Sequence, residues 1–199
     1  EINPGPVTTR IASFAKNNNC YIVCPLITRK NGKFYNSSIL LDRKGNIAAV
    51  YHKTHPHKNE MLANESFRGG SVIPGGIDQP VIETDFGKLG IQMGGDVHWT
   101  EGWSRLKQKG ADIVLFPSQF AGGRMLNYYA QKNNYYIVAA SRDGARIIDK
   151  SGTEIETTSD FLRFVWATVN LEKINVPSWP TNELIPKLYK KYGDRISVR

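Results

Sequence analysis

The sequence predicts an α/β protein in which helices cover the faces of a β-sheet. Short apolar runs such as CYIVCPLI, ADIVLFPS and YYIVAAS have the length of buried strands and are rich in β-branched and aromatic residues. Segments such as MLNYYAQKNN lie between them and carry apolar residues at helical spacing. Alternation of buried strands with amphipathic helices is typical of a sheet that packs against helical layers.

The N-terminal part predicts one helix followed by three strands. In residues 7–16, Val7, Ile11 and Phe14 recur at helical spacing, and the preceding Pro-Gly-Pro favours a helix start. The Asp-x-x-Gly sequence at 42–45 suits a hairpin turn between the second strand and the third. The three strands are expected at residues 20–27, 32–42 and 45–53.

Residues 54–80 are rich in proline and glycine, which predicts a long loop, and such loops in compact domains tend to be functional. Beyond the loop we expect a hairpin, two helices that alternate with two strands, a second hairpin and a final strand. In order, these elements are expected at 81–94, 100–110, 111–118, 125–134, 135–144, 145–158 and 164–174. We expect residues 1–175 to form one domain and residues 176–199 to be a C-terminal extension.

The chain carries a formal net charge of +8, which raises the question of a nucleic-acid partner. Its basic residues are scattered, however, and none of the common nucleic-acid-binding motifs is present. We therefore expect no nucleic-acid partner, and binding of another polyanion is kept as a third alternative. No apolar run is long enough to cross a membrane and the N-terminus lacks a signal pattern, so a cytoplasmic protein without a membrane partner is expected.

No cofactor and no metal are expected. The two thiols, Cys20 and Cys24, lie in a predicted strand and lack further ligands at metal-binding spacing. The histidines His52, His55 and His57 alternate faces of an extended chain, and no Asp or Cys joins them at ligand spacing.

Several ordered blocks of the chain resemble the nitrilase, or carbon-nitrogen hydrolase, superfamily. The blocks are KFYNSSILLDRKGNIAAVYHKTH, NESF, GKLGIQMGGDVHWTEGWSRLKQKGADIVLFPSQF and AQKNNYYIVAAS. The resemblance implies a four-layer α-β-β-α sandwich whose protomers commonly pair, so we expect a homodimer or larger homo-oligomer. It also implies a Glu-Lys-Cys triad that hydrolyses the C-N bond of an amide or nitrile through an activated cysteine beside a base and a fixed cation.

The resemblance assigns the family lysine to Lys53 in YHKTH. The family has a second glutamate that positions this lysine and the substrate, and it falls on Glu65 in NES. Glu60 lacks the Glu-Ser context and is the less favoured candidate for that role.

The nucleophile position of the family falls on a glycine. Aligning Gly90 and Asp96 with the family pattern places Gly94 where the cysteine belongs and Gly95 on the position that is usually aromatic. Glu101 then falls on a later family glutamate, which supports this register. Cys20 and Cys24 lie on a strand whose family counterpart is structural, so neither replaces the missing thiol.

The general-base glutamate of the family lies on a strand that would precede the first block. Glu1 matches an incidental residue, so we expect an N-terminally incomplete sandwich in which this base is absent.

Loss of the nucleophile predicts a pocket that binds a small amide, nitrile or carboxylate with impaired hydrolysis. The alternative is a non-catalytic binding or assembly subunit that pairs with itself or with an active paralogue. Backbone N-H groups at the glycine pair can approach an anion closely, and Arg124 can recognise an acidic group through its planar fork. The expected substrate-binding residues are Gly95, Asp96, His98, Phe120 and Arg124.

Overall fold

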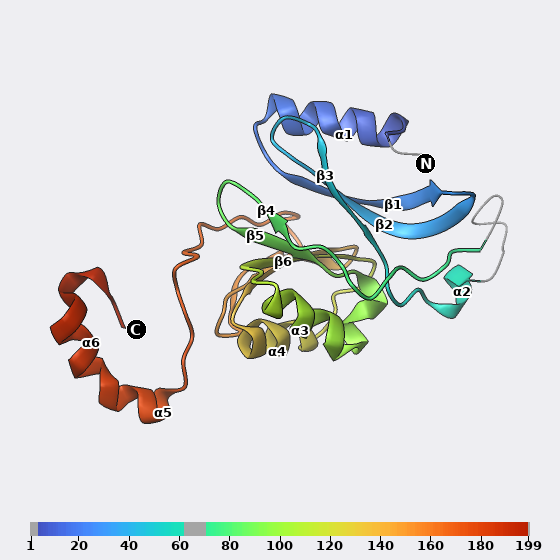
Figure 1. Ribbon diagram of the computed structural model, residues 1–199. Coiled ribbons are helices and arrows are strands. Elements are labelled where there is room, and N and C mark those ends of the chain that lie inside the picture. Colours follow the sequence, from blue (N-terminus) through green and yellow to red (C-terminus); the bar gives the residue numbers. More distant parts are fainter. Residues whose placement is uncertain (1–3, 62–70, 199) are drawn as a thin grey trace.

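Helix α1 (Pro6–Asn17) forms the outer layer on one side of the molecule (Figure 1). The computed structural model describes residues 4–61 and 71–198. Proline at the first position of α1 has the backbone angle that a helix needs and gives up a hydrogen-bond donor that would be unpaired there. The helix packs on the first sheet through the fully buried Ala15, which joins a small core with Ile39 and Leu41.

The first sheet has three antiparallel strands in the order β1-β2-β3. Asn31 and Gly32 connect the first two strands and both have positive φ, 51° and 77°, as a two-residue hairpin turn of type I′ requires. The strands are β1 (Ile22–Lys30), β2 (Lys33–Leu41) and β3 (Ile47–His52).

The second sheet has six strands in the order β4-β5-β6-β7-β8-β9. Its central strands β5, β6 and β7 are parallel, and the remaining neighbours are antiparallel. The strands are β4 (Ile82–Glu83), β5 (Lys88–Ile91), β6 (Ile113–Ser118), β7 (Tyr136–Ser141), β8 (Gly144–Ile148) and β9 (Glu154–Thr157).

Helices α3 (Thr100–Gln108) and α4 (Met125–Asn133) cover the outer face of the second sheet, as Figure 1 shows. Trp103 of α3 stacks on Tyr129 of α4 with ring centroids 4.5 Å apart, and both are fully buried. A separate core lies between the two sheets and includes Leu40 and Tyr51 from the first and Ile91 from the second. The molecule is therefore the expected four-layer α-β-β-α sandwich.

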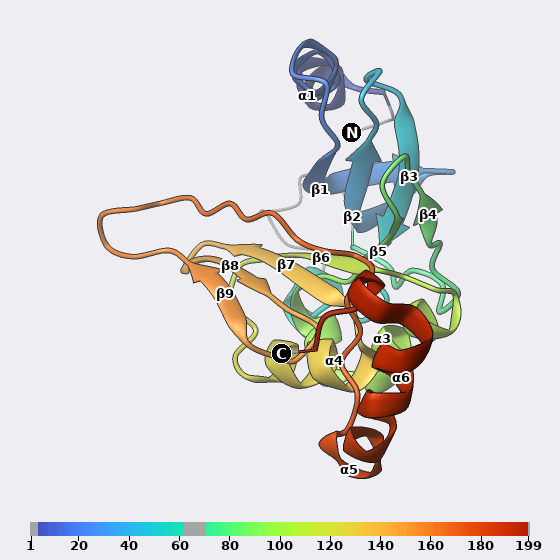
Figure 2. The same cartoon turned by 90° about the vertical axis from the view of Figure 1, so that its left-hand side faces the viewer.

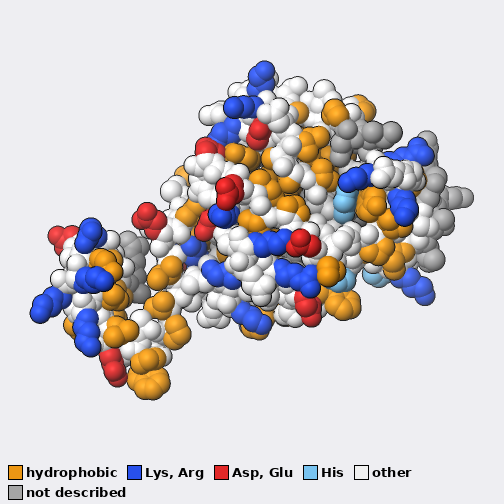
Figure 3. Space-filling model, viewed as in Figure 1, with side chains coloured by type: hydrophobic (Ala, Val, Ile, Leu, Met, Phe, Trp, Pro, Cys, Tyr) orange, Lys and Arg blue, Asp and Glu red, His pale blue; other side chains and the backbone are white. Residues whose placement is uncertain are grey.

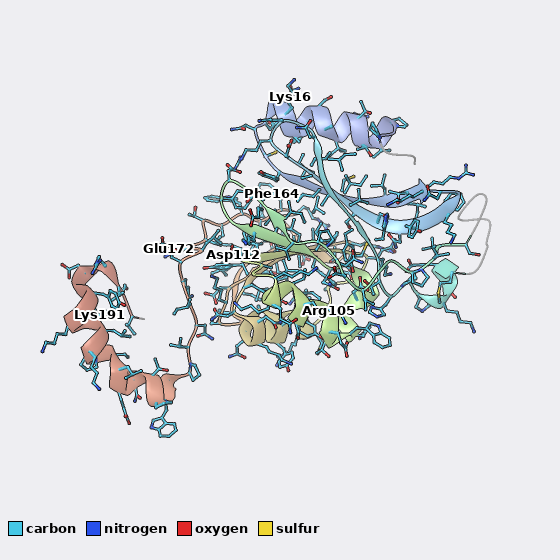
Figure 4. The ribbon with its side chains drawn as sticks, in the orientation of Figure 1. Lys16, Arg105, Asp112, Phe164, Glu172 and Lys191 are labelled. Atoms are coloured by element: carbon cyan, nitrogen blue, oxygen red, sulfur yellow. The ribbon has the colours of Figure 1, made fainter. Side chains whose placement is uncertain are left out.

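The final strand expected at 164–174 does not form, and this prediction is wrong. The segment leaves β9 in a wide excursion and returns across the second sheet without a strand assignment (Figure 2). Val169 and Leu171 pack against the core between the sheets, whereas Phe164 and Trp166 are 66% and 75% exposed. Phe164 is labelled in Figure 4. The alternation in the sequence therefore reflects one packed face and one exposed face of an extended segment that has no neighbouring strand in the part of the chain described.

Residues 170–175 are held against the second sheet by side chains. The hydroxyl of Tyr136 donates to the carbonyl of Asn170 at 2.9 Å, and the ammonium of Lys150 donates to the carbonyl of Leu171 at 2.7 Å. Asn134 exchanges two hydrogen bonds with the backbone of Asn175, at 2.9 and 3.0 Å.

Beyond residue 175 the chain leaves the body and ends in a small helical tail, where Lys191 is labelled in Figure 4. The tail comprises α5 (Ser178–Thr181) and α6 (Ile185–Tyr192), joined by a 3-10 turn, and none of its described residues is buried. No helix in the described ranges has the length and apolar character to span a bilayer. On the face shown in Figure 3, Lys and Arg side chains are scattered over the body and the tail.

Candidate active site

Lys53 follows strand β3 and its side chain is only 6% exposed. Its backbone N-H donates to the carbonyl of Asn36 at 2.8 Å, which continues the pairing of β3 with β2 by one residue. The ammonium of Lys53 donates to Oε1 of Glu60 at 2.5 Å. A buried ammonium is costly unless a carboxylate accompanies it, so this pair is what allows a lysine at this position.

Glu60 belongs to the short helix α2 (Lys58–Met61), which lies within the predicted loop. Its Oε2 accepts a hydrogen bond from Nδ2 of Asn36 at 2.7 Å, and its Oε1 also accepts from the backbone N-H of His57 at 3.2 Å. Burial acts to raise the pKa of the Glu60 carboxyl, but the hydrogen bonds from Asn36 and Lys53 and the positive charge of Lys53 lower it below the usual 4.5. Glu65, the favoured partner from the sequence, lies outside the described residues.

Gly94 opens the 3-10 helix η2 (Gly94–His98) that follows β5, and it lies beside Lys53. A Cβ atom built on Gly94 would be 3.3 Å from Nζ of Lys53 and 3.5 Å from its Cε. A Cβ atom on Gly95 would be 3.3 Å from the carbonyl oxygen of His55 and 3.9 Å from Cε of Lys53. The glycine pair therefore borders the end of the lysine side chain, where any side chain at position 94 would touch the ammonium group.

Asp96 is fully buried and forms hydrogen bonds with both the segment that carries Lys53 and the segment that carries Gly94. Its Oδ2 accepts hydrogen bonds from the hydroxyl of Tyr51 at 2.6 Å and from the backbone N-H of Met93 at 3.2 Å. Its Oδ1 accepts from the backbone N-H of His55 at 2.9 Å and lies 3.0 Å from Nδ1 of that ring. Burial and the nearby Asp96 charge raise the pKa of Tyr51 well above its usual value, so Tyr51 stays a hydrogen-bond donor.

The other expected binding residues lie at the surface. His98 is exposed and its ring stacks on Phe120, with centroids 6.4 Å apart, and Phe120 is itself 40% exposed. Arg124 is exposed at the start of α4 and borders a shallow hollow to which neither Lys53 nor Gly94 contributes. The residues lining this hollow are Arg124, Asn127, Tyr128, Gln131, Ser151, Gly152 and Glu154.

Sequence reasoning missed Asn36 and Tyr51 as parts of the site. The predicted hairpin of β2 and β3 could have indicated Asn36. Ser37 pairs with His52, so the next residues along the two strands, Asn36 and Lys53, lie opposite each other. Tyr51 could have been found from its spacing, because side chains two residues apart in an extended strand lie on the same face and Tyr51 is two residues before Lys53. Within residues 4–61 and 71–198, no group of three His, Cys, Asp or Glu side chains is arranged to hold a metal ion.

A family model described as carbon-nitrogen hydrolase matches residues 1–174. The chain belongs to the carbon-nitrogen hydrolase family. The deaminated glutathione amidase of Mus musculus is 29% identical over 150 residues, which cover 66% of this chain and 46% of the relative. The protein of the same name from Dictyostelium discoideum is 28% identical over 158 residues, which cover 70% of this chain and 53% of that relative. The chain thus spans about half the length of these curated relatives.

Solved structures of this superfamily share the fold. A carbon-nitrogen hydrolase from Helicobacter pylori G27 superposes with a TM-score of 0.67 at 20% identity, covering 77% of this chain and 63% of that one. A cysteine-to-alanine mutant of the amidase from Nesterenkonia sp. AN1, in complex with butyramide, superposes with a TM-score of 0.64 at 20% identity, covering 76% and 62%.

Proposed function

We propose that the site around Lys53 binds small carboxamides or carboxylates without efficient hydrolysis. The observation that carries the proposal is the 3.3 Å between Nζ of Lys53 and the Cβ position of Gly94, which is the position assigned to the family nucleophile. With glycine there, position 94 itself carries no thiol beside the ammonium of Lys53.

Loss of the nucleophile affects chemistry and binding differently. Covalent catalysis divides one difficult step into two easier ones, so removing the thiol raises the barrier of the reaction. The lysine charge and the nearby backbone N-H groups interact with a carbonyl or carboxylate oxygen whether or not a bond to sulfur forms. Binding of a small ligand is therefore compatible with the loss of turnover.

Calorimetry with butyramide and with butyrate tests the binding step. Butyramide is chosen because the Nesterenkonia amidase mutant was solved in complex with it. The matched variant is Lys53→Gln, which keeps a donor for Glu60 and removes the positive charge, with its fold checked by circular dichroism. Saturable heat in the wild type that is lost in Lys53→Gln supports the proposal, whereas no heat from either ligand, or equal heat in the variant, overturns it.

An ammonia-release assay with butyramide tests the catalytic step. We expect release at the rate of buffer alone, because the described residues place no thiol beside Lys53. Release well above buffer, abolished in Lys53→Gln, would show that the chain is an active amidase.

An assembly subunit is the second candidate function. Large apolar side chains stay exposed between β9 and the tail, including Phe161 at 100% and Trp166 at 75%, and such exposed groups are characteristic of interaction surfaces. We propose on this ground that the chain forms a homodimer or larger homo-oligomer. Light scattering coupled to size-exclusion chromatography over a range of protein concentrations tests this, and a monomer at every concentration would refute it.

A further inference from the structure

Helix α6 has one apolar side and one basic side. Its sequence, IPKLYKKY, contains three lysines and no acidic residue. Residues one helical turn apart share a side, which places Leu184, Leu188 and Tyr192 together. The lysines lie on the opposite side and are Lys187, Lys190 and Lys191, the last of which is labelled in Figure 4.

Both kinds of side chain in the tail are open to solvent. Trp179, Leu184 and Tyr189 are 73%, 48% and 43% exposed. In the described ranges the three lysines of α6 are exposed and none of them forms an ion pair with a carboxylate. The family model matches residues 1–174, so the tail lies outside the part of the chain that this match covers. The tail therefore exposes positive charges and large apolar side chains next to each other.

Tyr192 lies where the two sides of α6 meet. The ammonium of Lys191 is 5.0 Å from the centre of its ring, and the guanidinium carbon of Arg195 is 5.6 Å from it. Tyrosine and tryptophan favour the headgroup level of a bilayer, because one end of the ring is apolar and the other is polar. Lysine and arginine at that level attract anionic lipids. The charge and the polarity of the tail thus match an anionic lipid surface.

A nucleic acid would match only the basic half of this surface. Its phosphates would neutralise the lysines, but the apolar side of α6 would stay in water. Helix α6 is also much too short to cross a bilayer, so it would lie along the surface with its apolar side toward the acyl chains.

We propose that the tail binds the surface of an anionic lipid bilayer. The lysines of α6 contact the headgroups, and Trp179 and Leu184 enter the boundary between the headgroups and the acyl chains. The sequence predicted no membrane partner because no apolar run is long enough to cross, but a helix that lies on the surface needs no such run. The proposal does not involve the site around Lys53.

Sedimentation of the 199-residue protein with lipid vesicles tests the proposal. The vesicles contain phosphatidylserine and phosphatidylcholine in equal parts, or phosphatidylcholine alone, and the partition coefficient is measured at physiological ionic strength. We expect the wild type to bind the mixed vesicles at least about a hundredfold more tightly than the neutral ones. The triple variant Lys187→Gln, Lys190→Gln and Lys191→Gln should bind the mixed vesicles about a hundredfold more weakly than the wild type.

The matched control makes the same change of charge on the body of the protein. It combines Lys30→Gln, Lys33→Gln and Lys44→Gln, which replace exposed lysines of the first sheet and its turns. Binding should change by less than about threefold, because salt screens charges that lie away from the lipid surface.

A second variant tests the apolar contact. Trp179→Ser combined with Leu184→Ser should bind the mixed vesicles about tenfold more weakly, because less apolar surface then leaves water. Both side chains are exposed, so the body should stay folded, and circular dichroism checks this.

Several results would overturn the proposal. They are equal binding of the wild type to both kinds of vesicle, an equal loss in the control variant, and unchanged binding in the apolar variant. Retention of single-stranded RNA without vesicle binding, lost in the α6 lysine variant, would assign the surface to nucleic acid instead.

Discussion

Gly94, which the resemblance aligns with the family nucleophile, lies in the left-handed region of backbone conformation, with φ of 51°. A side chain there is strained for a reason independent of catalysis. Gly123 has a similar φ of 60°, but a Cβ atom on it would contact nothing within 4 Å. The two glycines therefore allow backbone strain to be separated from contact with Lys53.

We expect Gly94→Ala and Gly123→Ala each to lower the free energy of unfolding by about 1 kcal/mol, measured by urea denaturation. Only Gly94→Ala is expected to weaken butyramide binding as well, because its new methyl group meets the lysine ammonium. Equal ligand affinity in both variants would show that the volume beside Gly94 is not where the ligand sits.

Restoring the thiol alone is expected to leave the 199-residue chain inactive. A cysteine at position 94 needs a base to take its proton. The carboxylates that the structure places nearby are already engaged, Asp96 by Tyr51, Met93 and His55, and Glu60 by Lys53 and Asn36. Ammonia release from butyramide by Gly94→Cys at many times the rate of buffer would contradict this expectation.

The Glu60 carboxyl predicts a pH dependence of stability. Its pKa is lowered on folding, so the ionised pair stabilises the protein at neutral pH and that contribution is lost as the pH falls below the usual 4.5 and through the folded value. Urea denaturation of the wild type and Glu60→Gln should therefore show a stability difference at neutral pH that shrinks in acid. A difference that is constant, or that grows in acid, would mean that the pKa of Glu60 is not lowered.

The site was only partly predictable from the sequence. Lys53 and Gly94 came from the resemblance to the family, and the structure brings them together. The choice between Glu60 and Glu65 depends on how a proline-rich loop folds back on β2, and no local pattern specifies that path. The contact of Glu60 with Asn36 is a consequence of tertiary structure.

At the scale of elements, most strongly periodic segments were predicted correctly, but the strand expected at residues 164–174 does not form. Helices α1, α3 and α4 and the strands of both sheets follow from apolar spacing and turn residues. Residues 164–174 have the alternation of a strand, but a strand also needs a neighbour to accept its backbone hydrogen bonds. Whether a neighbouring strand is available depends on how the whole sheet assembles. Alternation of apolar and polar residues alone therefore predicts more strands than form.

The exposed apolar face of this segment predicts self-association. Replacing Phe164 and Trp166 together by threonine should reduce the binding of a dye that fluoresces on apolar surfaces and the concentration-dependent light scattering of the protein. The free energy of unfolding should change little, because both side chains are mostly exposed. Val169→Thr is the contrasting variant, since Val169 packs against the core between the sheets and its loss should destabilise the fold. Unchanged scattering in the double variant would remove the segment as an interaction surface.

At the scale of the whole molecule, three cores among the described residues join the four layers, and residues 176–198 of the tail take part in none of them. The cores lie between α1 and the first sheet, between the sheets, and between the second sheet and helices α3 and α4. Residues 170–175 are tied to the second sheet by the side chains of Tyr136, Lys150 and Asn134. We therefore propose that the domain ends near residue 175.

Two truncations test this boundary. Removing residues 176–199 should leave the midpoint of thermal unfolding unchanged within about 2 °C, because none of the described tail residues is buried. Removing residues 170–199 should lower it by several times that amount, because the hydroxyl of Tyr136 and the ammonium of Lys150 each lose the backbone carbonyl that accepts their hydrogen bond. Equal loss in both truncations would place the stabilising contacts in the tail and move the domain boundary beyond residue 175.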